Sequence, residues 1–269
     1  MAEHDLLTGD VHLVRRMNRD VILKLIREQG PVSRTELARK TRLTPATAFS
    51  IVEKLVQQGL VQETGIGPSQ GGRRPMLFEF NPRSYGVIGV DIRSAQVLGL
   101  VTDLDAQPEL IVSNDYDTDS DVDVLDLTTQ TIRELIAASP FPRERLMGLC
   151  VAVPGLLDVK GGIVVESRIW NWSNLPLREL LAAEFDLPIY MEADDKALAV
   201  GESFFGAGRG IPNVICLKIG RGLGAGLVMD SVLVRGADNM AGEIEHILVD
   251  PEGPRCYCNN YGCLTTLVS

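Results

Sequence analysis

One histidine and three cysteines gather near the end of the 269-residue sequence. His246 is followed by Cys256, by Cys258 and, after four more residues, by Cys263. One imidazole and three thiolates form a closed tetrahedral donor set, which suits a structural Zn²⁺ with no open coordination position. The alternative is a loop with free cysteines, but four ligands within eighteen residues favour a metal. The sequence therefore predicts a structural zinc site.

The first eighty residues carry the signals of three short helices. Hydrophobic residues at helical spacing predict helices at Asn18–Gln29, Arg34–Thr41 and Pro45–Gln58. Ser33 and Glu36 form a capping box at the start of the second helix. Thr44 is the expected N-cap of the third, because Pro45 fits the first helical position. Three helices of these lengths are typical of a helix-turn-helix unit.

The third helix is expected to enter the major groove of DNA. Near its start it would expose side chains able to contact base edges and thymine methyls: Thr44, Ala46, Thr47, Phe49 and Ser50. Basic side chains around it can reach phosphates: Arg34, Arg39, Lys40, Arg42 and Lys54. The alternative is a three-helix domain whose basic residues only solvate it.

Two predicted strands, Leu60–Thr64 and Met76–Phe80, flank the glycine-rich loop GIGPSQGGRRP. Such a loop is typical of a wing, and Arg73 and Arg74 near its end could enter a narrow minor groove. The first domain is thus expected to be a winged helix-turn-helix over residues 1–81, and the second domain to span 86–269.

Charge and composition agree with this division. Up to Tyr85 the sequence has 13 Lys and Arg against 9 Asp and Glu, whereas the rest has 13 against 27. A basic head on an acidic body is typical of a nucleic-acid-binding head, although chance variation between two domains is the plainer alternative. Hydrophobic residues make up 45% and charged residues 23% of the chain, as in soluble globular proteins. With no long apolar run and no signal-peptide pattern, we expect a cytoplasmic protein that has no membrane partner.

The second domain alternates strands with helices, which indicates an α/β fold. Strands are expected at Gly86–Asp91, Val97–Asp103, Leu146–Val153, Pro188–Glu192 and Val214–Ile219. Helices are expected at Leu125–Ala138, Leu177–Glu184 and Lys196–Phe205. The segment Ile163–Leu175, which holds both tryptophans, is expected to be irregular.

Taken together, these features resemble the ROK family of repressors, open reading frames and sugar kinases, over essentially the whole chain. Cys256–Cys263 is similar to the family's C-x-C-G-x-x-G-C signature, with Asn259 where glycine is usual. The resemblance implies an actin/hexokinase-like domain with sugar and ATP sites between two lobes. Repressor members, including those of xylose and N-acetylglucosamine genes, carry an N-terminal winged helix. They release DNA on sensing a sugar or a phosphorylated partner protein.

The resemblance also assigns residues to a sugar site. Asp195 matches the aspartate that acts as general base in the family's kinases, and Asp194 replaces the neighbouring asparagine. Two carboxylates can still accept hydrogen bonds from hydroxyls, although their repulsion makes the pair costly to bury. The alternative for this pair is a helix N-terminus that carries carboxylates because of the helix dipole.

A second sugar-binding segment, Glu243–His246, resembles the family's E-x-G-H motif. Glu243 would hold sugar hydroxyls, and His246 would serve both the zinc ion and the shape of the sugar pocket. Two positions depart from the pattern: Glu245 stands where glycine is usual, and Thr265 where the family has another sugar-binding glutamate. A sugar ligand is expected, without its identity.

The phosphate-binding segments of the family's kinases are altered. The first, D-x-G-G-T, is replaced by Asp91–Ala95, where Arg93 and Ser94 stand in place of the glycines. The second is the glycine-rich turn Gly220–Gly226, in which Arg221 replaces the usual threonine. Phosphoryl transfer depends on positioning and charge stabilisation, so these changes indicate a sensor rather than an enzyme.

Family members usually continue for a hundred residues or more past the cysteines. The resemblance therefore implies that the second domain lacks its C-terminal portion here, as a fragment or as a natural truncation, with apolar surface exposed near the C-terminus. The favoured interpretation is a homodimeric repressor of carbohydrate genes that binds palindromic double-stranded operator DNA and is released by a sugar. Two alternatives are an ATP-dependent sugar kinase with a DNA-binding head, and a zinc-stabilised DNA-binding protein without a ligand.

Overall fold

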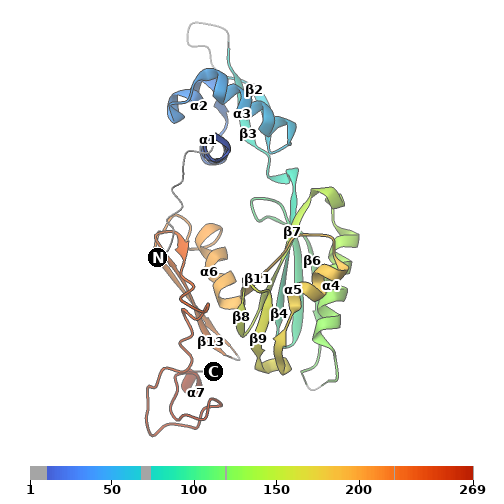
Figure 1. The fold of residues 1–269 in the computed structure, drawn as a ribbon, viewed down its shortest axis with the longest axis vertical. Helices are drawn as coiled ribbons and strands as arrows, with labels where there is room; N and C mark the ends of the chain where they lie inside the picture. The colour runs from blue at the N-terminus through green and yellow to red at the C-terminus, as the bar shows by residue number, and fades with distance from the viewer. Residues whose placement is uncertain (1–10, 68–73, 119, 221, 269) are drawn as a thin grey trace, which may run out of the picture. The chain divides into compact units, whose positions relative to one another are not determined.

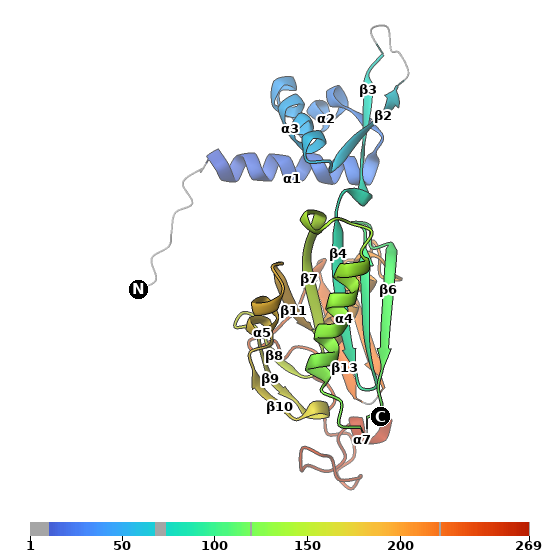
Figure 2. The same ribbon diagram turned by 90° about the vertical axis from the view of Figure 1, so that its right-hand side faces the viewer.

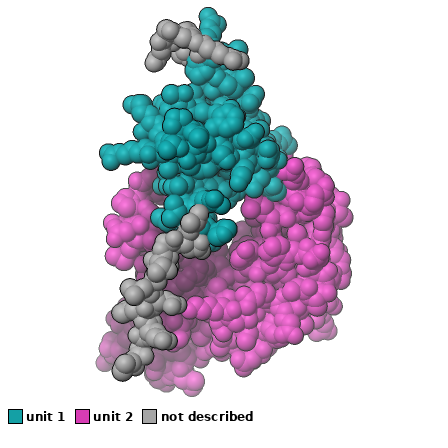
Figure 3. All heavy atoms as spheres, turned by 45° about the horizontal axis from the view of Figure 1, so that its top comes forward, with its two compact units in different colours: residues 1–85 teal, residues 86–269 magenta. Residues whose placement is uncertain are grey.

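The computed structural model describes residues 11–67, 74–118, 120–220 and 222–268. The chain divides into two compact units, Met1–Tyr85 and Gly86–Ser269, which Figure 3 colours separately. No helix in the described ranges is long and apolar enough to cross a membrane.

Unit 1 is a winged helix (Figure 1). Its helices and strands are α1 (Val11–Gln29), β1 (Val32–Ser33), α2 (Arg34–Thr41), α3 (Pro45–Gln57), β2 (Val61–Ile66) and β3 (Met76–Phe80), followed by a 3₁₀ turn at Pro82–Ser84. The three strands form an antiparallel sheet in the order β1-β3-β2. Helix and sheet side chains share one core, which includes Ile22, Leu37, Val52, Leu55 and Phe78.

The N-terminal caps of α2 and α3 are confirmed. The backbone N–H of Glu36 donates to Ser33 Oγ at 3.2 Å, and that of Thr47 donates to Thr44 Oγ1 at 3.2 Å. The other half of the predicted capping box does not form among the described contacts: the carboxylate of Glu36 lies 2.9 Å from Lys40 Nζ, in an i,i+4 ion pair, instead of accepting from the Ser33 N–H. These local contacts fix where both helices begin.

Helix α1 begins seven residues before the predicted start at Asn18. In its first half two apolar side chains are exposed, Val14 by 49% and Met17 by 58%, and Leu13 is only half-buried. Burial periodicity therefore could not locate this end of the helix from the sequence.

Unit 2 is built on a five-stranded sheet in the order β11-β7-β4-β5-β6 (Figure 2). Its strands are β4 (Gly86–Arg93), β5 (Gln96–Thr102), β6 (Pro108–Asp115), β7 (Leu146–Val153) and β11 (Ile189–Ala193). Strand β7 pairs in parallel with both β4 and β11, while β4, β5 and β6 pair antiparallel. Helix α4 (Val124–Ala138) packs against β5 and β6, and α5 (Leu177–Glu184) against β11.

One strand of this unit was not predicted, and one prediction was wrong. Strand β6 was not predicted, because its apolar side chains are only half-buried or exposed. The segment expected to be irregular contains β9 (Ile163–Ser167), a 3₁₀ turn (Arg168–Trp170) and β10 (Trp172–Leu175), in a sheet ordered β10-β9-β8 with β8 (Leu156–Asp158). These strands have three to five residues, too few to establish a hydrophobic period.

A second layer follows along the chain. The antiparallel strands β12 (Val214–Ile219), β13 (Leu223–Met229) and β14 (Val232–Leu233) form a sheet on which α6 (Asp194–Phe204) packs (Figure 1). The chain then runs through turns, with isolated bridges between Leu248 and Cys263 and between Arg255 and Tyr261, to the short helix α7 (Thr265–Val268).

Candidate carboxylate site, metal centre and nucleic-acid surface

The predicted sugar-binding aspartates lie where β11 ends and α6 begins. Ala193 closes the strand and Asp194 and Asp195 occupy the first turn of the helix. In the parallel register Ala193 pairs with Val153, and Asp91 of β4 pairs with Ala152. The carboxyl ends of parallel strands share one edge of the sheet, so Asp91 and the aspartate pair lie along the same edge.

Glycines in β13 let α6 approach the second sheet closely. A Cβ atom at Gly226 would lie 2.3 Å from the Ala199 Cβ and 2.4 Å from the Asp195 backbone oxygen. A Cβ at Gly224 would lie 3.0 Å from Asp195 Oδ2. The predicted glycine-rich turn at Gly220–Gly226 is therefore shorter than expected: the connection between β12 and β13 ends before Leu223, and Gly224 and Gly226 lie in β13, where they make room for the helix. Arg221 of this turn lies outside the described residues.

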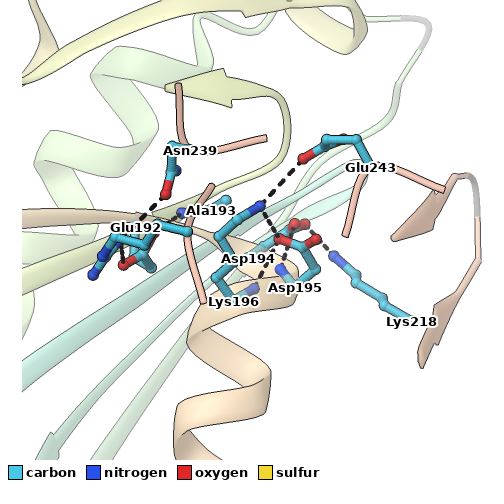
Figure 4. Close-up of polar contacts among 9 residues, drawn as sticks. Glu192, Ala193, Asp194, Asp195, Lys196, Lys218, Asn239 and Glu243 are labelled. Carbon is cyan, nitrogen blue, oxygen red and sulfur yellow. Dashed lines mark hydrogen bonds and ion pairs between the residues drawn. The ribbon is translucent and has the colours of Figure 1, made fainter. Parts of the chain in front are cut away.

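A third glycine places Glu243. Gly242 has φ +89°, and a Cβ there would meet the Ala225 backbone oxygen at 1.6 Å. The backbone N–H of Ala225 donates to the Gly242 oxygen at 3.0 Å, which fixes the loop on β13. As a result Glu243 lies near Asp194 and Asp195 (Figure 4). The Lys196 side chain joins the two segments, because its Nζ contacts Glu243, which is 47 residues further along the chain.

Three cations that sequence reasoning missed accompany these carboxylates. The Lys196 side chain is completely buried, and its Nζ lies 3.3 Å from Glu243 Oε1 and 3.7 Å from Asp195 Oδ1 (Figure 4). Lys218 of β12 forms an ion pair with Asp194, and Arg235 forms one with Glu192. The only signal in the sequence was the position of Lys196 directly after two aspartates.

Burial changes the acidity of this cluster. Asp195 is 4% exposed, and burial, with smaller contributions from Glu243 and Asp194, raises the pKa of its carboxyl to about 6, against an opposing effect of Lys196. The group is therefore mainly an ionised hydrogen-bond acceptor at neutral pH and a neutral acid below pH 6. Acceptors of this kind, each with a cation nearby, suit ligand hydroxyl groups.

In the altered first phosphate segment, Arg93 forms an ion pair with Asp91. Arg93 Nε donates to Asp91 Oδ2 at 2.6 Å, and Arg93 Nη1 donates to Gln96 Oε1 at 3.2 Å. Within the described residues the other carboxylate oxygen, Asp91 Oδ1, is buried without a hydrogen-bond partner. The guanidinium group thus neutralises the aspartate at the end of β4 that lies on the shared sheet edge.

The four predicted zinc ligands converge. Cys256 Sγ lies 3.6 Å from His246 Nδ1, Cys258 Sγ lies 3.6 Å from Cys263 Sγ, and all four ligand atoms lie within 4.8 Å of one another. In a tetrahedral site with Zn–S bonds of about 2.3 Å, neighbouring ligand atoms are about 3.5–3.8 Å apart. The donor set and its spacing therefore fit Zn²⁺.

His246 belongs to this cluster rather than to the carboxylate site. Its Nε2 lies 3.4 Å from Glu245 Oε1, and its ring packs edge-on against Tyr257 with centroids 4.9 Å apart. Among the described contacts none joins its ring to Asp194, Asp195 or Glu243. The structure thus brings together three of the four predicted sugar contacts.

Helix α3 of unit 1 buries Ala48, Val52 and Leu55. Ala46, Phe49 and Ser50 are exposed on its opposite side, and Thr47 is half-buried with its hydroxyl 2.8 Å from that of the exposed Thr44. Arg42 and Arg74 are also exposed, whereas Arg73 lies outside the described residues. The exposed side of α3 thus presents the side chains that the sequence assigned to base contacts.

Arg34 differs from the other predicted contacts. It is half-buried, and its guanidinium carbon lies 4.1 Å from the centroid of the Phe49 ring and 4.6 Å from that of Phe78. The side chain is therefore packed between two aromatic rings instead of extending freely into solvent.

Comparisons with known proteins cover both units. The ROK family model matches residues 87–269, and the MarR family model matches residues 17–64. The xylose repressor of Bacillus spizizenii is 33% identical over 255 residues, which cover 95% of this chain and 66% of the relative. The N-acetylglucosamine repressor of Escherichia coli O6:H1 is 30% identical over 272 residues, which cover 97% of this chain and 64% of the relative.

A crystal structure of a ROK family transcriptional regulator, a homologue of the E. coli Mlc protein, superimposes with a TM-score of 0.80 at 28% identity. The superposition covers 95% of this chain and 65% of that one. This chain spans about two thirds of the length of the curated relatives that it matches. The comparison supports one architecture, a winged helix joined to an actin-like α/β domain.

Proposed function

Because the chain belongs to the ROK family, we propose that it is a cytoplasmic, DNA-binding transcriptional repressor of carbohydrate-metabolism genes. Its second unit would sense a sugar without phosphorylating it. Relatives that carry both units are named as repressors, which supports this assignment.

The observation that carries the DNA-binding half of the proposal is the exposed side of α3. Thr44, Ala46, Thr47 and Ser50 lie at or near the start of a capped helix whose other side packs into the core of a winged unit. A helix N-terminus is the part of a recognition helix that contacts base edges. Arg42, Arg74 and, in the wing, Arg73 would contact phosphates or the minor groove. We expect a homodimer on a palindromic operator, because two-fold symmetric proteins bind two-fold symmetric sites.

The carboxylate cluster supports a sugar ligand. Asp194, Asp195 and Glu243 offer acceptor oxygens at one place, and Lys196 and Lys218 offset most of their charge. A nearly balanced site favours an uncharged polyol over an ion, since hydroxyl groups satisfy the acceptors without adding charge. His246 would act through the zinc site and not through direct contact with the sugar.

The Asp91–Arg93 pair supports a sensor over a kinase. Catalysis of phosphoryl transfer needs metal and phosphate close to an unencumbered carboxylate and a glycine-lined turn. Here the guanidinium group of Arg93 is hydrogen-bonded to the Asp91 carboxylate, and Arg93 and Ser94 stand in place of the glycines. We infer that the unit binds sugar without transferring phosphate.

Zinc would be held by His246, Cys256, Cys258 and Cys263, and four protein ligands leave no position for a substrate. Bound there, the ion would supply folding energy to the loop and no chemistry. The residues between Glu243 and His246 form a short connection, so the metal loop would also help to hold Glu243.

The experiment that tests the proposal uses the full chain on DNA. A random duplex library is selected on the protein, and binding to the selected duplex is titrated against salt and against D-xylose, D-glucose and N-acetylglucosamine. Salt-dependent binding that a sugar weakens is expected. ATP-dependent phosphorylation of one of these sugars, abolished by Asp195→Asn, would establish the kinase alternative. DNA binding that is indifferent to a wider sugar panel, together with no thermal shift by any sugar, would establish the ligand-free alternative.

A further inference from the structure

A phenylalanine stands on the exposed side of α3, the side that the proposed function assigns to DNA. Phe49 is 45% exposed and lies three residues after Ala46 and one before Ser50, so the three side chains share one face of the helix. Leaving that much of an aromatic ring in water forgoes part of the stabilisation that its burial would give. The core of unit 1 therefore does not account for its position.

The guanidinium group of Arg34 stacks on the Phe49 ring. The guanidinium carbon of Arg34 lies 4.1 Å from the Phe49 centroid and 4.6 Å from the centroid of Phe78, which is completely buried. Both distances lie within the range of about 6 Å for cation–π contact. The stack thus connects the exposed ring to the core of the unit, and it fixes the direction in which Phe49 points.

Other roles explain Arg34 poorly. It is the first residue of α2, where the helix dipole disfavours a positive charge. Its Nε is buried without a hydrogen-bond partner in the described part of the chain, which carries a desolvation cost. A planar guanidinium group that stacks on two rings compensates for these costs in a way that a lysine could not.

Resting on the proposed DNA-binding function, we propose that Phe49 is a specificity-determining residue that contacts a thymine 5-methyl group in the major groove. Arg34 is then the positioning residue that orients its ring, and not a phosphate contact. Thymine is the base with an apolar group in the major groove, and an apolar side chain held in a fixed orientation can recognise it without an ordering cost.

The test removes one methyl group at a time. Thymines of the selected duplex are replaced singly by deoxyuracil, which keeps base pairing and lacks the 5-methyl group. At one or two positions wild-type affinity should fall about fourfold, the effect of one buried methyl group. Phe49→Ala should bind the duplex with thymine and the duplex with deoxyuracil equally well at those positions. Because the ring is half exposed, this variant is expected to fold, and its circular dichroism and thermal midpoint check this.

The role of Arg34 is tested by the salt dependence of DNA binding and by a substitution that keeps the positive charge. Arg34→Met should leave the slope of log affinity against log salt unchanged, whereas loss of a phosphate contact lowers it by about 0.9 per contact. Arg42→Ala, a change at an exposed arginine of the same unit, is the matched phosphate-contact control and should lower the slope. Arg34→Lys, which keeps the charge and loses the stack, should still lose the discrimination between thymine and deoxyuracil.

The outcomes separate the two proposals. A wild-type protein that binds no duplex at low salt overturns DNA binding, and this inference with it. A protein that selects a sequence but is insensitive to every deoxyuracil overturns only the role of Phe49. If wild type and Phe49→Ala lose the same affinity when thymine is replaced by deoxyuracil, the role of Phe49 is overturned as well. A reduced salt slope in Arg34→Met overturns the positioning role of Arg34.

Discussion

Replacing Asp195 with asparagine should stabilise unit 2 at neutral and alkaline pH. The carboxylate is 4% exposed at the start of α6, and Glu243 and Asp194 add like charges beside it. Lys196 opposes these effects without cancelling them, so the pKa of Asp195 rises from 3.8 to about 6. The folded protein therefore prefers this side chain in its neutral form, which asparagine imitates.

The magnitude follows from linkage. Because the folded pKa exceeds the unfolded value, the favourable contribution of Asp195 is fully present below about pH 4 and is lost as the pH rises through 6. The pKa difference corresponds to about 3 kcal/mol of unfolding free energy. Asp195→Asn should thus match wild type near pH 4 and exceed it by up to about 3 kcal/mol at pH 8.

Urea unfolding followed by tryptophan fluorescence measures this in the full chain. Both tryptophans, Trp170 and Trp172, lie in unit 2, so the signal reports on that unit. Unfolding free energies are compared for wild type and Asp195→Asn from pH 4 to 8. Asp186→Asn, the same chemical change at an exposed position between α5 and β11, is the matched control for the loss of a carboxylate.

A variant that is less stable than wild type at pH 8 would refute the reasoning. It would mean that the ion pair between Lys196 and Asp195 outweighs the cost of burying the charge. A constant difference across the pH range would also refute it, because the effect would then come from packing and not from ionisation. The expected gain would instead identify Asp195 as a residue retained for binding at a cost in stability.

Three further predictions concern other parts of the chain. Gly242→Ala should destabilise unit 2 by about 2–3 kcal/mol or more in the same urea assay. The reason is that residue 242 has a positive φ and that its Cβ would overlap the Ala225 backbone oxygen. An unchanged urea midpoint would show that the loop does not rest on β13. Purified protein should contain one zinc per chain by elemental analysis, and Cys256→Ser should lose the metal and lower the thermal midpoint. Metal-free wild-type protein with the same midpoint would contradict the structural site. Thr44→Ala should destabilise unit 1 by about 1 kcal/mol through loss of the N-cap of α3, measured by urea unfolding followed by circular dichroism; an equal stability would show that Pro45 alone fixes the helix start.

How much of the fold could be predicted depended on how local the signal was. Helix α2, with a capping serine at its start, has the predicted bounds, and so do strand β7, which is a continuous apolar run, and strand β12, which is apolar except for Lys218. Helix α5 also has its predicted bounds. Strand β6 was missed because its apolar side chains are only half-buried or exposed, and β8 to β10 were missed because strands of three to five residues show no hydrophobic period. Pairing with the neighbouring strand of the chain stabilises each of them.

The sequence by itself determined the parts of this protein that depend on neighbours in the chain. The caps at Ser33 and Thr44 and the donors of the cysteine-rich loop are encoded within a few residues, and local chemistry suffices for them. Only the tertiary structure decided that Lys196 reaches Glu243, 47 residues away, and that Arg34 stacks between Phe49 and Phe78. These contacts join distant segments through close packing and burial, and burial also sets the charge state of Asp195. No periodicity or motif in the chain carries that information.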